Sequence, residues 1–303
     1  METCPEWAAT GLREQHISAD ISLSVWQYYS VTNDVEWLKT IGMPILTGVA
    51  DFVLSRAEFD GDTAHINGVI PPDEYVDMVD DSVYTNFAAA EALRFALLGA
   101  EEAGVVLEKA AAYAELSSAL VLIYDEKLGI HPEYRGYNGS IIKQADAVML
   151  HYPWGMEMEA TVQQADLEYY AARSDENGPA MTWSMHAIGF KDLGMLTEAA
   201  HYFDKAFQDN MQPPFMVWTE TPTGDAGNFL TGAGGFLQAL VFGYPGVRIE
   251  DERLLISSPS CPKNTEGIKL RGLGYLGSRM DISYYCSSSA AANNYSNMRG
   301  LSS

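Results

Sequence analysis

Apolar side chains recur at helical spacing through most of the first 245 residues. Between residues 14 and 30, for example, Ile17, Ile21, Val25 and Tyr28 share one face, which is typical of a helix that packs against a core on one side. By this criterion we expect helices over residues 14–30, 34–41, 44–56, 82–104, 107–124, 161–173, 180–193, 196–209 and 229–242. Several of them follow one another closely, so neighbouring helices should pack as pairs.

Two stretches interrupt the helical pattern, and a third region replaces it. Residues 128–154 and 210–227 mix glycines, prolines and aromatic residues without a long period, which is typical of functional loops. From residue 249 onward the texture changes to alternation, as in Met280, Ile282 and Tyr284, which predicts short β-strands. We therefore expect a helical unit over residues 1–245, a small β unit over residues 246–286 and a disordered tail over residues 287–303.

The charge balance limits the possible partners. The chain has 18 basic and 41 acidic residues and a formal net charge of −23, so polyanions such as nucleic acids and anionic membranes are poor partners. Its first residues lack the basic and apolar parts of a signal peptide. No apolar run approaches the ~18 residues of a membrane span. These features predict a cytoplasmic protein that binds neither nucleic acid nor membrane.

The cysteines do not point to a metal or a cofactor. Cys4, Cys261 and Cys286 are few and widely scattered, unlike a disulfide framework or a zinc cluster. We expect isolated thiols, no metal site and no cofactor.

A stiff acidic loop precedes the helix expected at residue 82. Gly68 and the Pro71-Pro72 pair stop regular structure, and Asp73 and Glu74 follow directly. No Lys or Arg occurs between Arg56 and Arg94. The loop is either a site or a solvated acidic segment that caps the next helix through residues 80–82.

A second carboxylate lies in a similar setting. Glu220 stands beside Trp218 in a segment, residues 206–247, that contains no Lys, Arg or His. It is either a structural loop glutamate or one half of a pair with Glu74. Hydrolysis of a glycosidic bond needs one carboxylic acid to protonate the leaving oxygen and one carboxylate to activate water. Two aromatic-rich carboxyl loops on a helical scaffold therefore favour carbohydrate chemistry.

Several motifs, in order along the chain, resemble glycoside hydrolase family 65. They are Glu14-Gln15-His16-Ile17-Ser18-Ala19-Asp20-Ile21, the segment from Gly68 to Tyr75, Val83-Tyr84-Thr85-Asn86, Lys143-Gln144-Ala145-Asp146, and Trp218-Thr219-Glu220 continued by the segment from Asn228 to Gly232. The resemblance covers residues 4–285 or so. Within the family, residues 178–185 and 217–220 resemble the branch that removes glucose from collagen rather than the phosphorylases.

The resemblance implies a fold and an activity. The fold is an all-α (α/α)6 toroid of the six-hairpin type, incomplete here, followed by a small β unit. The activity is that of an inverting α-glucosidase acting on glucosyl-galactosyl-hydroxylysine, with Glu74 as general acid and Glu220 as general base. The partner would be a carbohydrate or glycopeptide. The site would include further residues, of which two bind the sugar and three line the mouth: Lys143, Gln144, Trp218, His16 and Asp20.

Alternatives remain open at this point. Acid trehalase-like hydrolysis is the nearest rival within the family. His16 and Asp20, four residues apart, also fit an intrahelical pair. The family carries a Trp-Asp motif that this chain lacks, and we count roughly four helix pairs where a closed barrel needs six. The alternative interpretation is an inactive, truncated homologue that binds sugar or a partner protein and self-associates through exposed apolar faces.

Overall fold

The computed structural model describes residues 9–224, 226–251 and 253–286 of the 303-residue chain. Helices dominate the described residues up to residue 243. They are α1 (Thr10–Arg13), α2 (His16–Thr32), α3 (Val35–Trp37), η1 (Leu38–Gly42), α4 (Met43–Arg56), α5 (Val83–Ala103), α6 (Ala110–Ala119), η2 (Ala147–Leu150), α7 (Ala160–Ala171), α8 (Met181–Asp192), α9 (Leu196–Gln208), α10 (Leu230–Gln238) and η3 (Ala239–Gly243). A helix is found in each segment where the periodicity predicts one, although α6 ends at Ala119 rather than at residue 124.

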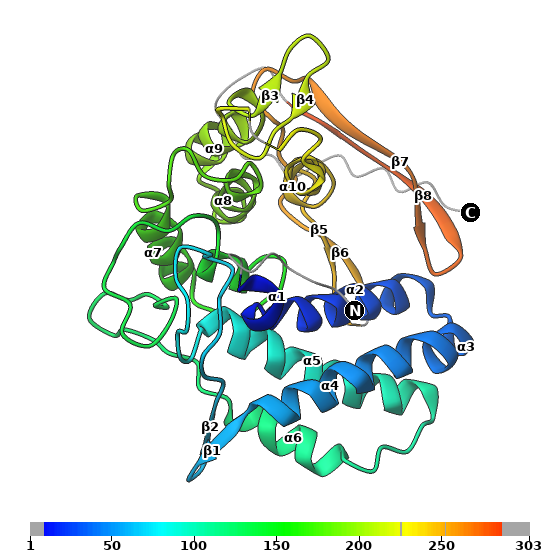
Figure 1. Cartoon of the computed structure of the whole chain (residues 1–303). Coiled ribbons are helices and arrows are strands. Elements are labelled where there is room, and N and C mark those ends of the chain that lie inside the picture. Colours follow the sequence, from blue (N-terminus) through cyan, green and yellow to red (C-terminus); the bar gives the residue numbers. More distant parts are fainter. Residues whose placement is uncertain (1–8, 225, 252, 287–303) are drawn as a thin grey trace.

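One group of helices packs around α5. Figure 1 shows α2, α4, α5 and α6 side by side in the lower half of the molecule. Leu46 of α4 and Leu93 of α5 are fully buried between them. Trp26 of α2 stacks on Phe95 of α5 with ring centroids 5.6 Å apart. Ser82 begins α5 as its N-cap, because its side chain accepts a hydrogen bond from Thr85 N.

A second group of helices surrounds α8. In Figure 1, α8, α9 and α10 lie above the first group, and α7 flanks them. Every residue of α8 from Thr182 to Lys191 is buried, so this helix has neighbours on all sides. Tyr202 of α9 stacks on both Trp183 and Phe190 of α8, with centroid separations of 5.7 Å and 5.4 Å.

The strands form four separate antiparallel pairs. They are β1 (Glu58–Asp60) with β2 (Thr63–His65), β3 (Met211–Gln212) with β4 (Val217–Trp218), β5 (Val247–Ile249) with β6 (Leu254–Ile256), and β7 (Gly267–Tyr275) with β8 (Ser278–Tyr285). The long β7–β8 hairpin confirms the alternation in the sequence, and its turn reaches α2, where Leu276 N donates to Val31 O. The short β1–β2 hairpin was not expected.

Two carboxylate contacts tie the β5–β6 turn to the first group of helices. Asp251 accepts hydrogen bonds from Trp26 Nε1 at 2.6 Å and from Arg94 Nη1 at 2.7 Å. The boundary expected at residue 245 and the incomplete (α/α)6 toroid both stay predictions. The expected tail, residues 287–303, and Cys4 lie outside the described residues.

The prediction of isolated thiols is wrong for two of the three cysteines. Cys261 and Cys286 form a disulfide, with Cα atoms 6.3 Å apart. Cys286 follows β8 directly, and its backbone N–H bonds to Glu266 O just before β7, so the hairpin folds the chain back onto itself. The expected cytoplasmic location stays a prediction.

One helical stretch is more apolar than the sequence analysis allowed. Residues 35–56, from α3 to α4, have the length and mean hydropathy, 1.3, of a membrane span. Leu46, Ala50 and Val53 of this stretch are buried in the core around α5. The same composition therefore has a structural explanation as a core helix.

Candidate active site where three loops meet

Hydrogen bonds fix the acidic loop, residues 66–82, at several points along its length. Its two arms are joined by reciprocal backbone hydrogen bonds of 3.0 Å between Val69 and Val79, and Gly68 N donates to Asp80 Oδ1. Gly68 has a φ of +68°, which a glycine adopts without strain. Asp73 and Asp81 are fully buried. The loop is thus a built structure and not a solvated acidic segment.

Asp73 connects this loop to the one that carries Lys143. Its Oδ1 accepts hydrogen bonds from Tyr75 N at 3.2 Å and from Lys143 N at 2.7 Å, and its own N–H donates to Asp146 Oδ2 at 3.0 Å. A side-chain contact adds to these, because Gln144 Nε2 donates to Pro72 O at 2.6 Å. Residues 72–75 and 143–146 therefore form one clamped unit beside Glu74.

Three buried carboxyl groups lie in or beside this clamped unit. Asp73, Asp146 and Glu133 are all fully buried. Burial, with a contribution from neighbouring carboxylates, raises the pKa of Glu133 and of Asp146 well above the ordinary range, and burial also raises the pKa of Asp73. The sequence analysis named Asp73 and Asp146 within motifs without giving them a role, and it missed Glu133.

The loop that carries Glu220 is held by the start of α8. Glu220 O accepts hydrogen bonds from Ala180 N at 2.9 Å and Asn210 Nδ2 at 3.0 Å. Thr219 is buried, and its hydroxyl donates to Asn210 O. The backbone of Glu220 is therefore fixed, while its side chain remains 30% exposed.

Lys143 brings the two predicted glutamates together. Its Nζ lies 2.5 Å from Glu74 Oε2 and 3.8 Å from Glu220 Oε1. The two carboxyl oxygens are thus no further apart than these two distances added together. The side chains of all three residues are between 24% and 31% exposed. Glu220 lacks basic residues nearby in sequence, but the fold supplies one from a distant loop.

The charges around Glu74 set its protonation. Burial raises the pKa of Glu74, but hydrogen bonds from Lys143 and from Glu14, together with the nearby positive charge, outweigh it and hold that pKa below its ordinary value. Burial and the hydrogen bond to Glu74 raise the pKa of Glu14 from 4.5 to about 7. Glu74 is therefore ionised in this state, and its neighbour keeps a proton near neutral pH.

His16 and Asp20 form the intrahelical pair that their spacing allows. His16 Nδ1 lies 2.9 Å from Asp20 Oδ2, and Tyr84 OH donates to the other oxygen of Asp20 at 2.9 Å. His16 is 8% exposed. Its ring adds positive charge near both Glu14 and Glu74 when protonated. Contact of His16 or Asp20 with a sugar stays a prediction.

Trp218 packs beside the Glu220 loop, and its place at the mouth of the site stays a prediction. It lies in β4, and its ring packs on Phe236 of α10 with centroids 5.2 Å apart. Gly232 allows this approach, since a Cβ there would lie 3.0 Å from Trp218 Cδ1 and 2.7 Å from Ala180 Cβ. The Gly-rich start of α10 is therefore explained by close packing beside the Glu220 loop.

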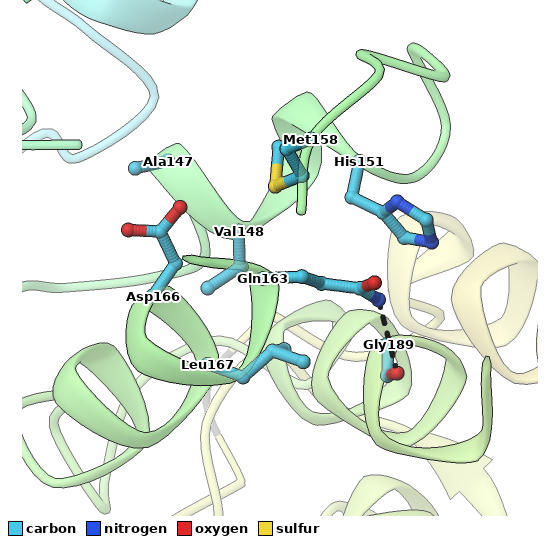
Figure 2. A pocket seen from close by; sticks show the side chains of 8 residues that line it. All are labelled: Ala147, Val148, His151, Met158, Gln163, Asp166, Leu167 and Gly189. Atoms are coloured by element: carbon cyan, nitrogen blue, oxygen red, sulfur yellow. Dashed lines mark hydrogen bonds between the residues drawn. The ribbon is translucent and has the colours of Figure 1, made fainter. Parts of the chain in front are cut away.

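Neither cavity found among the described residues is the carboxylate site. The one in Figure 2 is enclosed by η2, α7 and α8, and Gln163 crosses it to donate to Gly189 O at 3.2 Å. Its free volume of about 10 Å³ is close to the needs of a single water, far below those of a sugar. The second, of the same size, lies behind His16 and Thr85. Within the described ranges, no cluster of His, Cys, Asp and Glu side chains is arranged to hold a metal ion.

Two glutamates that meet across a short gap on a helical scaffold form the arrangement that many glycosidases use. Comparisons with known proteins agree. Residues 2–140 match the profile of the Glycosyl hydrolase family 65 central catalytic domain. These and the following matches place the chain in glycoside hydrolase family 65.

Relatives of known name match nearly the whole chain, and their names give different activities. The chain is 42% identical to a protein-glucosylgalactosylhydroxylysine glucosidase of Dictyostelium discoideum, over 94% of the chain and 40% of that protein. It is 41% identical to the Danio rerio protein of the same name, over 93% of the chain and 43% of that protein. It is 35% identical to a kojibiose hydrolase of Mucilaginibacter mallensis, over 90% of the chain and 40% of that protein. The chain thus spans about two fifths of these relatives.

A solved structure supports the fold. A chain assigned as a kojibiose phosphorylase from the human microbiome matches with a TM-score of 0.71 at 19% identity, over 88% of this chain and 44% of that chain. The match shows a shared, mostly helical fold.

Proposed function

We propose that this site hydrolyses an α-linked glucoside with inversion of configuration. The observation that carries the proposal is the meeting of Glu74 and Glu220 at one ammonium group, from loops far apart in the chain. In this sugar-free state the nearest oxygens of the two glutamates lie closer than the roughly 6.5–9.5 Å that separates the carboxyl groups of inverting enzymes. The inverting assignment therefore rests on the pairing itself and on the family resemblance.

Each residue has a distinct part in the reaction. Glu74 protonates the leaving oxygen, and Glu220 removes a proton from the attacking water on the opposite face of the sugar. Lys143 and Gln144 bind hydroxyl groups of the glucose unit. When the Lys143 ammonium turns to a hydroxyl, it leaves Glu74, and the main influence that keeps Glu74 ionised is removed.

The charge of the site favours water over phosphate as the attacking group. One lysine faces three glutamates, Glu14, Glu74 and Glu220. A phosphorylase must hold a phosphate dianion where the water attacks, and the ionised carboxylate of Glu220 there would repel it. This argument separates the proposal from the phosphorylase activity named for some relatives.

The substrate proposed is glucosyl-galactosyl-hydroxylysine or a similar α-linked glucose. It is supported by the names of four relatives at 36% to 42% identity, all of them glucosidases for that unit. An acid trehalase-like activity is the second candidate within the family, since a cell wall acid trehalase of Arthroderma benhamiae is 29% identical.

A catalytically inactive sugar-binding chain is the candidate from a different class. It is supported by the Trp-Asp dipeptide that these 303 residues lack. Several large apolar side chains of helices are also exposed, among them Leu230 at 82% and Leu196 at 51%. Such faces promote self-association, which sedimentation of the chain would detect.

The test is a product analysis. The 303-residue chain is incubated with glucosyl-galactosyl-hydroxylysine, kojibiose and trehalose, each with and without inorganic phosphate. We expect free glucose from the first substrate at a rate that phosphate does not change. Glucose 1-phosphate as product would contradict hydrolysis, and sugar binding without turnover would support the inactive candidate.

A further inference from the structure

Glu14 lies beside Glu74 because its neighbours in sequence are tied to the acidic loop. Arg13 O accepts a hydrogen bond from Ile70 N at 3.0 Å, and Arg13 Nη1 pairs with Asp77 Oδ2 at 2.5 Å. On the other side, Gln15 Oε1 accepts from Arg56 Nε at 2.8 Å. Arg56 in turn donates to Asn67 O at 3.3 Å. The short segment between α1 and α2 is therefore held against the loop on both sides of Glu14.

The Glu14 side chain points at Glu74 from this fixed position. The two carboxyl groups form a side-chain hydrogen bond, and both are about half-buried. A hydrogen bond between two carboxyl groups needs one proton, because two carboxylates offer acceptors only. Lys143 is close enough to lower the proton affinity of Glu14, but the hydrogen bond joins Glu14 to Glu74.

We propose that Glu14 is a positioning residue that stores the acid proton of the reaction and passes it to Glu74 when sugar binds. This inference rests on the proposed function, and it assigns a role to a residue that sequence analysis quoted only as part of a motif. In the sugar-free state the proton lies on Glu14, and Lys143 keeps Glu74 ionised. Once Lys143 turns to a sugar hydroxyl, the proton moves to Glu74 along the existing hydrogen bond.

The proton transfers balance over one turnover. Glu74 gives its proton to the leaving oxygen and becomes a carboxylate. Glu220 takes one proton from the attacking water and releases it to solvent, and one proton from solvent restores Glu14. The net reaction hydrolyses one glycosidic bond with one water molecule. Glu14, Glu74 and Glu220 return to the protonation states in which they began.

The groups around the pair agree with this assignment. Glu14 faces Glu74, which raises its proton affinity, and His16 and Lys143, which lower it. Glu74 faces Lys143, Glu14, His16 and the carboxyl of Asp73. The net effect raises the pKa of Glu14 to about 7, so the pair keeps one proton below that pH and loses it above.

Glu14→Gln tests the proposal through the pH dependence of kcat/KM. In the wild-type chain we expect activity to fall as the pH rises past about 7, where the pair loses its proton. Glutamine still donates a hydrogen bond to Glu74 but cannot supply a proton. Glu74 then titrates alone beside Lys143, which holds its pKa below the ordinary value of 4.5, so the fall should move by more than about two pH units to the acid side. Activity at pH 7 should drop by about 10²-fold, with little change at the acid end.

A matched control and a second readout separate this role from a structural one. Glu58→Gln makes the same chemical change at an exposed position of β1 and should leave the profile unchanged. Infrared spectra of the wild-type chain should show a carboxyl that loses its proton near pH 7 and that is missing from Glu14→Gln. Signals of the buried Asp73, Glu133 and Asp146 should be the same in both chains. A profile that does not move, or a signal that survives in Glu14→Gln, would overturn the proposal. Because the infrared signal needs no turnover, it decides the matter even if the chain releases no glucose.

Discussion

Glu74→Gln should slow release of glucose from an α-linked disaccharide by about 10²–10⁴-fold, the usual contribution of a general acid. Glutamine preserves the size of the side chain and can still accept a hydrogen bond from Lys143, so the fold should persist. The measurement is the initial rate of glucose release at saturating substrate. KM should change little, because the lost contact is with the leaving oxygen rather than with the glucose unit.

The leaving group gives a sharper version of this test. Fluoride departs as an anion and needs no proton from the enzyme. With α-glucosyl fluoride as substrate, Glu74→Gln should therefore keep a rate within about tenfold of the wild-type chain. An equal loss on the disaccharide and on the fluoride would remove Glu74 from the role of general acid.

Glu220→Gln should lose activity on both substrates, again by about 10²–10⁴-fold. An amide cannot take a proton from water, and the attack on the sugar requires that step whatever the leaving group is. The rates are measured on the same disaccharide and on α-glucosyl fluoride. Hydrolysis of the fluoride at the wild-type rate would show that Glu220 is not the base.

One control serves both variants. Glu176→Gln changes an exposed glutamate of the segment between α7 and α8 and should leave both rates unchanged. Circular dichroism and urea unfolding should give the same midpoint for all three variants. A lower midpoint in only one of them would assign its loss of rate to folding.

Much of the fold could be predicted because apolar residues recur at the helical period. In α2, α5 and α9 the period of apolar residues reflects one buried face of each helix. Such a face can be recognised from the residues of that one segment alone. The β1–β2 hairpin was missed because its strands are three residues long and Phe59 is exposed. Strands this short give no alternation to detect.

The candidate site could be predicted only in part, because its parts come from distant segments. Glu74 and Glu220 were identified by their unusual neighbours and by the family resemblance. The ammonium between them belongs to Lys143, and no pattern in the sequence measures that distance. The partnership of Glu14 with Glu74 was missed for the same reason, as was the pairing of Cys261 with Cys286.

The most direct test of the account is the configuration of the first glucose released. Proton nuclear magnetic resonance during the first minutes of hydrolysis, before the anomers equilibrate, reports it. Two carboxyl groups with a water between them predict β-glucose from an α-linked substrate. Release of α-glucose first would mean that a carboxylate attacks the sugar directly, and it would contradict the roles assigned to Glu74 and Glu220.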